Sequence, residues 1–200
     1  MNMTPVRRAA ASAAAIAIAG LGIQAVPAPA LANPEDGGQH CVARVTTGTP
    51  EAVCFDTFAE ALSRASGGRL TYGPKNAEEA ARTPGFAARV NAANAANRVS
   101  AAAGYDTVLS IHYTASNWGG SDLIWVGTSN CSTSTNNTDY EIDTMPAGWV
   151  NVITSYLTFA NCWVQHWEDT FQGGDHVGYH GSRSYIGSTM DNRTSSLRWS

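Results

Sequence analysis

Residues 191–196, with the sequence Asp-Asn-Arg-Thr-Ser-Ser, combine side chains that bind hard cations. Two oxygen donors open the stretch, two unrestricted positions follow, and two hydroxyls close it. Ca²⁺ takes about six to eight oxygen ligands from carboxylates, amides, backbone carbonyls and hydroxyls. Six common surface residues are weak evidence for a metal site by themselves, so their meaning depends on the rest of the chain.

The chain repeats this stretch and a second pattern with it. Residues 151–155, Asn-Val-Ile-Thr-Ser, match residues 192–196, Asn-Arg-Thr-Ser-Ser. Each of these stretches is preceded by a second shared pattern, at residues 113–120 and 166–173, which are offset by 53. In this pattern an aromatic residue or His is followed by any four residues, a large aromatic residue, any one residue and then Gly. Two patterns duplicated in the same order predict two copies of one supersecondary unit.

These paired motifs resemble those of the βγ-crystallin family. The unit of that family is a four-stranded Greek key with an early (Tyr/Phe/Trp)-x₄-(Phe/Tyr/Trp)-x-Gly hairpin. Its calcium-binding members also carry (Asn/Asp)-(Asn/Asp)-x-x-(Ser/Thr)-Ser. The resemblance implies one sandwich domain at 105–200, with Greek keys at about 105–159 and 160–200. Residues 162–200 look especially like secreted actinobacterial versions.

The resemblance also implies a role for each motif position. Gly120 and Gly173 would supply the positive φ of a folded hairpin, which glycine adopts freely. The closing serine of each corner would point inward and tie the corner by hydrogen bonds, while the hydroxyl before it faces an ion.

The two calcium sites implied by the resemblance are crossed between the keys. One would join the Arg193 carbonyl to the Thr154 hydroxyl, and the other would join the Val152 carbonyl to the Ser195 hydroxyl. Water and side-chain oxygens would complete the shells; these oxygens come from Asp191, Asn192 and Asn151. The alternative is that the corner hydroxyls only satisfy backbone groups of the fold.

This chain departs from the family pattern at two informative places. Val150 stands where the first corner motif has Asn or Asp, so one half-site lacks an oxygen donor. In the second hairpin the corner aromatic is either His166 or Trp167, and the second choice shifts that hairpin by one residue. One intact and one eroded corner predict weak binding, at about 10⁻⁵ to 10⁻³ M.

Two regions must position these motifs. Residues 33–104 are predicted to be mixed α+β. They begin with a hairpin of strands 41–45 and 52–55, and a helix follows that starts at a Thr57/Glu60 capping box and stops at Gly67-Gly68. A short strand at 69–72 and helices at 76–82 and 86–103 complete the region. Along the last helix Asn91, Asn94 and Asn97 predict a solvated face. After Tyr105, short β-rich segments alternate with turns; they are 108–113, 123–126, 151–159, 162–167 and 197–199. The fold class is therefore α+β, with a C-terminal all-β two-Greek-key sandwich.

The first 32 residues have the features of a secretory signal peptide: a basic start at Arg7-Arg8, an apolar run and small residues before a cleavage site near Ala32. A secreted protein without a membrane span after cleavage is expected. The whole chain has a net charge of −4, and the leader removes two arginines and no acid. This acidic balance disfavours nucleic acid as a partner. Separately, we expect the protein to be a monomer.

Four cysteines remain, and in an exported chain an even number indicates disulfides. Three pairings are possible; Cys41–Cys54 and Cys131–Cys162 are preferred because each pair lies within one region. A zinc site would need closely spaced cysteine pairs, which are missing.

Three other functions compete with calcium binding. Catalysis is disfavoured because no GxSxG, HExxH or SxxK pattern occurs. A secreted protease, above all a metalloproteinase, is a possible partner, because some crystallin-like exported proteins inhibit such enzymes and the loop 130–137 would be tethered by Cys131. A glycan or cell-surface binding module would use exposed tryptophans, although packing in the core is the plainer role for most of the six.

Overall fold

The computed structural model describes residues 38–46, 48–71, 76–99 and 106–200. The predicted signal peptide at 1–32 and its cleavage site lie outside these residues, as do Tyr72 and the end of the predicted helix 86–103. Among the described residues, no helix combines the length and apolar character needed to cross a membrane.

The N-terminal region begins with the predicted hairpin. Strands β1 (His40–Arg44) and β2 (Ala52–Phe55) pair antiparallel with Cys41 opposite Cys54. A disulfide joins these two cysteines, and a second joins Cys131 to Cys162. The preferred pairing is thereby confirmed, and all four cysteines are used.

Three helices follow, and two of them have capped starts. Helix α1 (Phe58–Ala65) begins with the predicted capping box, in which Thr57 and Glu60 bond each other's backbone N–H groups. Helix α2 (Ala77–Arg82) is capped by the Asn76 side chain, and α3 (Phe86–Val99) is the longest. The strand expected at 69–72 is wrong over 69–71, because Arg69 and Leu70 instead hydrogen-bond Ser66 at the end of α1.

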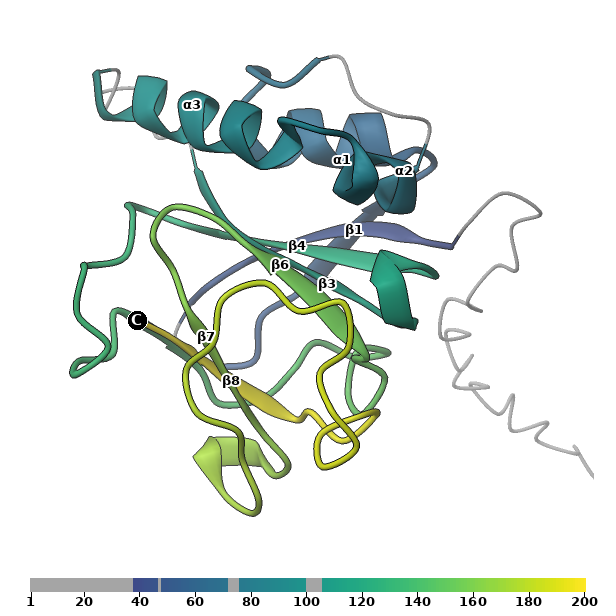
Figure 1. Ribbon diagram of the computed structural model, residues 1–200, viewed down its shortest axis with the longest axis vertical. Coiled ribbons are helices and arrows are strands. Elements are labelled where there is room, and N and C mark those ends of the chain that lie inside the picture. Colours follow the sequence, from purple (N-terminus) through teal and green to yellow (C-terminus); the bar gives the residue numbers. More distant parts are fainter. Residues whose placement is uncertain (1–37, 47, 72–75, 100–105) are drawn as a thin grey trace, which may run out of the picture. The chain divides into compact units, whose positions relative to one another are not determined.

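The larger sheet has the strand order β2-β1-β4-β3-β6. Strands β3 (Thr107–Tyr113), β4 (Asp122–Gly127) and β6 (Ser155–Thr158) belong to the first predicted key and pair antiparallel. Strand β1 pairs parallel with β4, so strands from both sides of residue 104 share one sheet. Figure 1 shows the helices over one face of this sheet.

The smaller sheet has the order β5-β8-β7, with β5 at Tyr140–Ile142, β7 at Val164–Trp167 and β8 at Ser196–Trp199. Strand β5 comes from the first key but pairs with β8 of the second. In return, Arg183 of the second key forms a bridge to Tyr156 on β6. The two keys are thus joined by one strand pairing and by one isolated bridge. The helices and the two packed sheets confirm the predicted α+β fold with a two-Greek-key sandwich.

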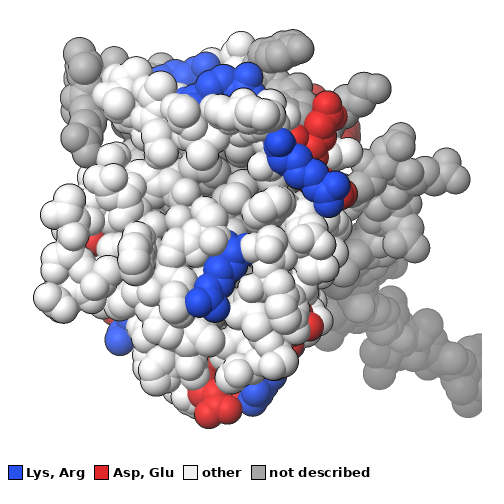
Figure 2. Space-filling view, in the orientation of Figure 1, with Lys and Arg blue, Asp and Glu red and all other residues white. Residues whose placement is uncertain are grey.

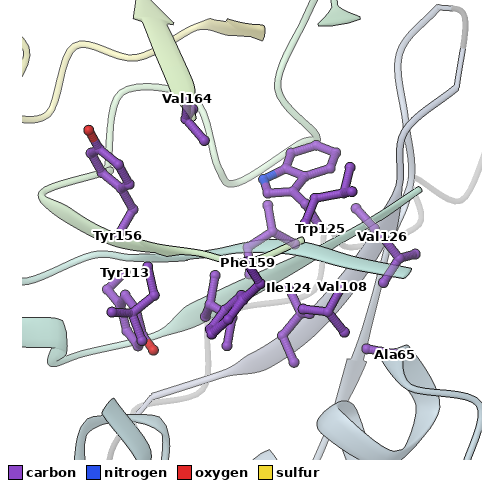
Figure 3. Close-up of a cluster of buried hydrophobic side chains, with 14 of the residues drawn as sticks. Ala65, Val108, Tyr113, Ile124, Trp125, Val126, Tyr156, Phe159 and Val164 are labelled. Carbon is purple, nitrogen blue, oxygen red and sulfur yellow. The ribbon is translucent and has the colours of Figure 1, made fainter. Parts of the chain in front are cut away.

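The core lies on both faces of the larger sheet. Every residue of β3 and β4 is buried, because helices cover one face and the smaller sheet covers the other. In Figure 3, Trp125 and Tyr156 lie on the side of Val164 from β7, whereas Val108 lies on the side of Ala65 from α1. Because both faces are covered, apolar residues predominate in β3 and β4 without strict alternation, and the polar residues among them are buried as well.

One asparagine of α3, Asn94, does not lie on the predicted solvated face. Asn94 is buried, and its amide both donates to the Val108 carbonyl and accepts from the Val108 N–H, each at 2.9 Å. The Asn91 side chain accepts a hydrogen bond from the Ala160 backbone. The expectation was wrong for Asn94, whereas Asn91 is exposed as expected and also hydrogen-bonds turn backbone. Nothing is described of the Asn97 side chain.

Candidate functional site

The two hairpins have the same folded shape, at an offset of 54 residues. The short helical turns η2 (Ser116–Trp118) and η3 (Thr170–Gln172) both contain left-handed residues: Asn117 and Phe171 have φ of 56° and 55°. The following turn glycines with positive φ are Gly120 at 77° and Gly174 at 71°.

This equivalence settles the alignment of the second hairpin. Its corner aromatic is Trp167, matching Tyr113, and Gln172 stands where Trp118 stands in the first hairpin. The offset of 53 and the role given to Gly173 were wrong, because Gly173 has a φ of −93° and Gly174 supplies the left-handed turn.

The closing serines tie these hairpins to the corners, as predicted. The Ser155 hydroxyl donates to the Ala115 carbonyl at 2.6 Å and accepts from the Trp118 N–H at 3.1 Å. The Ser196 hydroxyl makes the equivalent bonds to Asp169 at 2.7 Å and Gln172 at 3.1 Å. Both serines are fully buried, so their role is to satisfy buried backbone groups.

The two corner motifs lie against each other and cross. Asn151 and Asn192 both adopt positive φ, at 58° and 55°. The Asn151 N–H donates to the Thr194 carbonyl at 2.9 Å, and the Asn192 N–H donates to the Ile153 carbonyl at 3.0 Å. These bonds bring residues from the two keys into one reciprocal contact.

The predicted ligand hydroxyls take part in this crossing. The Thr154 hydroxyl donates to the side-chain oxygen of Asn192 at 3.4 Å, and the Ser195 hydroxyl donates to that of Asn151 at 3.1 Å. Among the described residues, none donates a backbone hydrogen bond to the carbonyls of Val152 or Arg193. The corners therefore bring together hydroxyl, amide and carbonyl oxygens, which suit a hard cation.

The charges around the two corners differ. Asp191 is partly buried and accepts weak hydrogen bonds from Tyr185 and Asn192, at 3.5 and 3.4 Å. The equivalent residue of the first corner, Val150, is 39 % exposed and offers no oxygen ligand from its side chain. The intact corner thus carries a carboxylate that its partner lacks.

The side chain of Arg193 is held by an ion-pair network. Its guanidinium bonds Glu168, with Nε at 3.1 Å, lies 3.6 Å from Asp175, and donates to the Thr189 carbonyl. The hydrogen bond from Arg193 lowers the pKa of Glu168, which keeps this partly buried carboxylate ionised. The sequence motif did not include Glu168 or Asp175, because both come from the second hairpin rather than from a corner.

A cavity of about 280 Å³ lies beside the first corner. Its lining holds hydroxyl, amide and apolar groups and no carboxylate; the residues are Thr114, Ser121, Gly148, Trp149, Val152 and Asn192. Among the described residues there is also no cluster of three or more His, Cys, Asp or Glu side chains suited to a metal. Any cation at the corners would therefore rely mainly on neutral oxygen ligands.

The remaining sequence candidates separate into core and surface. Trp125, Trp149 and Trp199 are buried, Trp118 and Trp167 are partly buried, and Trp163 is 48 % exposed. Most tryptophans therefore serve packing. His176 stacks on Trp167 with ring centroids 4.0 Å apart, and the His180 backbone pairs with Val164.

The tethered loop between β4 and β5 is polar and exposed over residues 133–138. Its base is fixed by the Cys131–Cys162 disulfide and by the Tyr140 hydroxyl, which accepts from the Ser129 N–H at 2.8 Å. Its middle is fixed by the C-terminal Ser200 hydroxyl, which donates to the Ser134 carbonyl at 2.6 Å. The loop is thus supported at both its base and its middle.

No protein-family model matches the chain, and no curated protein matches it. Solved structures similar to it include βγ-crystallin domains from Clostridium beijerinckii and Flavobacterium johnsoniae, each 13 % identical with a TM-score of 0.34. The N-terminal domain of Protein S is 11 % identical with a TM-score of 0.35. Each likeness covers 46 % of this chain and 93 to 95 % of the other.

Proposed function

We propose that this protein is a secreted, non-catalytic protein of βγ-crystallin type that binds Ca²⁺ weakly at its crossed corners and is stabilised by it. The observation that carries the proposal is the reciprocal contact of the corners, with the Thr154 and Ser195 hydroxyls each facing the amide oxygen of the opposite key. A cation bound there joins the two keys, so its binding energy adds to the stability of the sandwich.

The two sites differ in strength in this proposal. The stronger site combines the Arg193 carbonyl, the Thr154 hydroxyl and oxygens of Asn192 and Asp191. The weaker site combines the Val152 carbonyl, the Ser195 hydroxyl and Asn151, and lacks a carboxylate because Val150 replaces it. Affinity of oxygen-ligand sites rises with the number of charged ligands. One Ca²⁺ per chain, bound at about 10⁻⁵ to 10⁻³ M, is therefore expected.

Calcium titration by calorimetry tests the assignment directly. We expect one binding event in the wild type, loss of at least tenfold in affinity in Asp191→Asn, and no change in Asp56→Asn, which alters an exposed aspartate near α1. Equal affinity in all three proteins would show that Asp191 is not a ligand. The absence of any binding heat in the wild type at millimolar Ca²⁺ would contradict the proposal as a whole.

The rest of the proposal concerns the protein's environment and partners. We infer export after cleavage near Ala32, a monomeric state and no nucleic-acid partner. Two disulfides are compatible with an oxidising compartment. On the face shown in Figure 2, cationic side chains lie scattered among uncharged residues rather than in a stripe.

Inhibition of a secreted protease is the second candidate. The loop 130–137 supports it, because its base and middle are both tied down and a rigid loop loses little entropy on binding. Inhibition assays against secreted metallo- and serine proteases test this activity. No inhibition at tens of micromolar would exclude it, and inhibition retained after the loop is replaced by a short Gly-Ser linker would exclude this loop.

A further inference from the structure

Two histidines meet in the core between the sheets. His112 lies on β3 of the larger sheet, His166 lies on β7 of the smaller sheet, and both side chains are fully buried. Their Nε2 atoms are 3.1 Å apart, which is a hydrogen-bonding distance. Each histidine directly precedes the corner aromatic of its key, Tyr113 or Trp167, so the pair joins equivalent positions of the two keys.

The hydrogen bonds around the pair are compatible with one distribution of protons over the ring nitrogens, which the proposal adopts. The Trp199 indole can only donate, and it donates to the Ser110 hydroxyl at 3.0 Å. That hydroxyl lies 3.5 Å from Nδ1 of His112 and can donate to it. His112 then carries its proton on Nε2 and donates to His166. His166 keeps its proton on Nδ1, which has no hydrogen-bond partner among the described residues.

This arrangement accepts two neutral rings and resists a further proton. A proton added to Nε2 of His166 would set two N–H donors against each other at 3.1 Å. A proton added to Nδ1 of His112 would place a cation in a fully buried position. Burial lowers the pKa of His112 to about 3, and burial together with nearby positive groups lowers that of His166 well below its usual value.

The neighbouring groups give no compensation for such a charge. The Tyr156 ring on β6 packs on both histidines, with centroids 5.6 and 4.5 Å away, and burial raises its pKa to about 12, so it stays neutral. Arg183 and His180, from the segment after β7, both oppose protonation of His166. Among the described residues, no carboxylate acts on either ring.

We propose that the His112–His166 contact is an acid-sensitive latch, which holds the two sheets together while both rings are neutral and releases them when both rings are protonated. The unfolded chain takes up these protons below about pH 6.5, whereas the folded core excludes them to much lower pH. The contribution of the pair to stability is therefore full above about pH 6.5 and is lost as the pH falls. Each histidine lowers the folding equilibrium constant up to about tenfold per pH unit, and the pair about a hundredfold.

Urea unfolding between pH 7.5 and pH 4, followed by the fluorescence of buried Trp125 and Trp199, measures this proton uptake. Wild type is compared with His112→Gln and His166→Gln, because glutamine keeps hydrogen-bonding groups but does not titrate. His176→Gln, at an exposed histidine, is the control. The slope of the logarithm of the folding constant against pH equals the number of protons taken up on unfolding. We expect each core variant to lower this number by about one. Slopes equal to that of wild type in both core variants would overturn the latch.

A measurement on the unaltered protein applies if a core variant does not fold. Nitrogen-15 NMR of the imidazole rings reports their tautomers and protonation directly. The latch predicts the Nε2–H tautomer at His112, the Nδ1–H tautomer at His166, and neutral rings in the folded protein down to about pH 4.5. Protonation of either ring near pH 6.5 with the native spectrum retained would refute it.

Discussion

The Ser195 hydroxyl of the second key donates a hydrogen bond to the side-chain oxygen of Asn151 of the first key, at 3.1 Å. Thr154 makes the reverse contact to Asn192. Because each key completes the other's corner, neither corner is finished until the two keys have packed. Stability and ligand binding at this place are therefore properties of the pair of keys.

Replacing Asn192 separates the backbone role from the ligand role. Asn192→Gly keeps the left-handed backbone but removes the amide oxygen, whereas Asn192→Ala also strains the backbone, at about 1 to 2 kcal/mol. We expect both variants to lose calcium affinity, and the alanine variant to be the less stable in urea. Equal stability of the two variants would show that the left-handed conformation is not a constraint here.

Removing the closing serine of the second key should loosen its hairpin. Ser196→Ala leaves the Asp169 carbonyl and the Gln172 N–H without their buried partner. Leaving a buried polar group unsatisfied costs about 1 to 3 kcal/mol, so we predict a loss in that range by urea unfolding. Ser188→Ala, at an exposed serine, is the control and should change little. A loss below about 0.5 kcal/mol in Ser196→Ala would contradict the structural role of the corner serine.

Asn94 should be more important to stability than its place on a polar helix suggests. Its amide satisfies both backbone groups of Val108, so Asn94→Ala leaves a buried N–H and a buried carbonyl unpaired. We expect a loss of about 2 to 4 kcal/mol in the free energy of unfolding. An effect no larger than that of an ordinary surface substitution, about 0.5 kcal/mol, would argue against this contact.

Asp122 gives a pH dependence of opposite sign to that of the histidine pair. Burial raises the pKa of Asp122 to about 6, although its hydrogen bond with His40 opposes the shift. In the unfolded chain this carboxyl ionises near pH 3.8, so its contribution to stability falls as the pH rises from about 4 to 6 and is constant above. Asp122→Asn does not titrate. Measured from pH 4 to 7, its unfolding free energy should rise relative to that of wild type, and parallel curves would contradict the shift.

Local signals in the sequence predicted much of the fold. The capping box at Thr57, the β1–β2 hairpin, both disulfides and the closing serines all depend on residues close in sequence or on a repeated motif. The parallel pairing of β1 with β4 could not be predicted in the same way, since no local pattern specifies which distant strand lies beside another. Strand β5 was missed because its three residues follow a long polar loop.

The candidate site was predicted in its residues but not in all its geometry. The offset of the second hairpin was misplaced by one residue, because Gly173 and Gly174 are adjacent and only the backbone angles show which one makes the left-handed turn. Glu168, Asp175 and Tyr185 lie beside the second corner but belong to neither corner motif. The buried histidine pair also had no sequence signal, because His112 and His166 meet only when the sheets pack.

The central claim, that Ca²⁺ stabilises the sandwich through its corners, is tested most directly by melting curves in millimolar Ca²⁺ and in EDTA. Ligand at about 100 times its dissociation constant adds about 2.7 kcal/mol to stability, which is a shift of several degrees for a domain of this size. We predict such a rise for the wild type and its reduction in Asp191→Asn. Identical midpoints in Ca²⁺ and EDTA for the wild type would contradict the account.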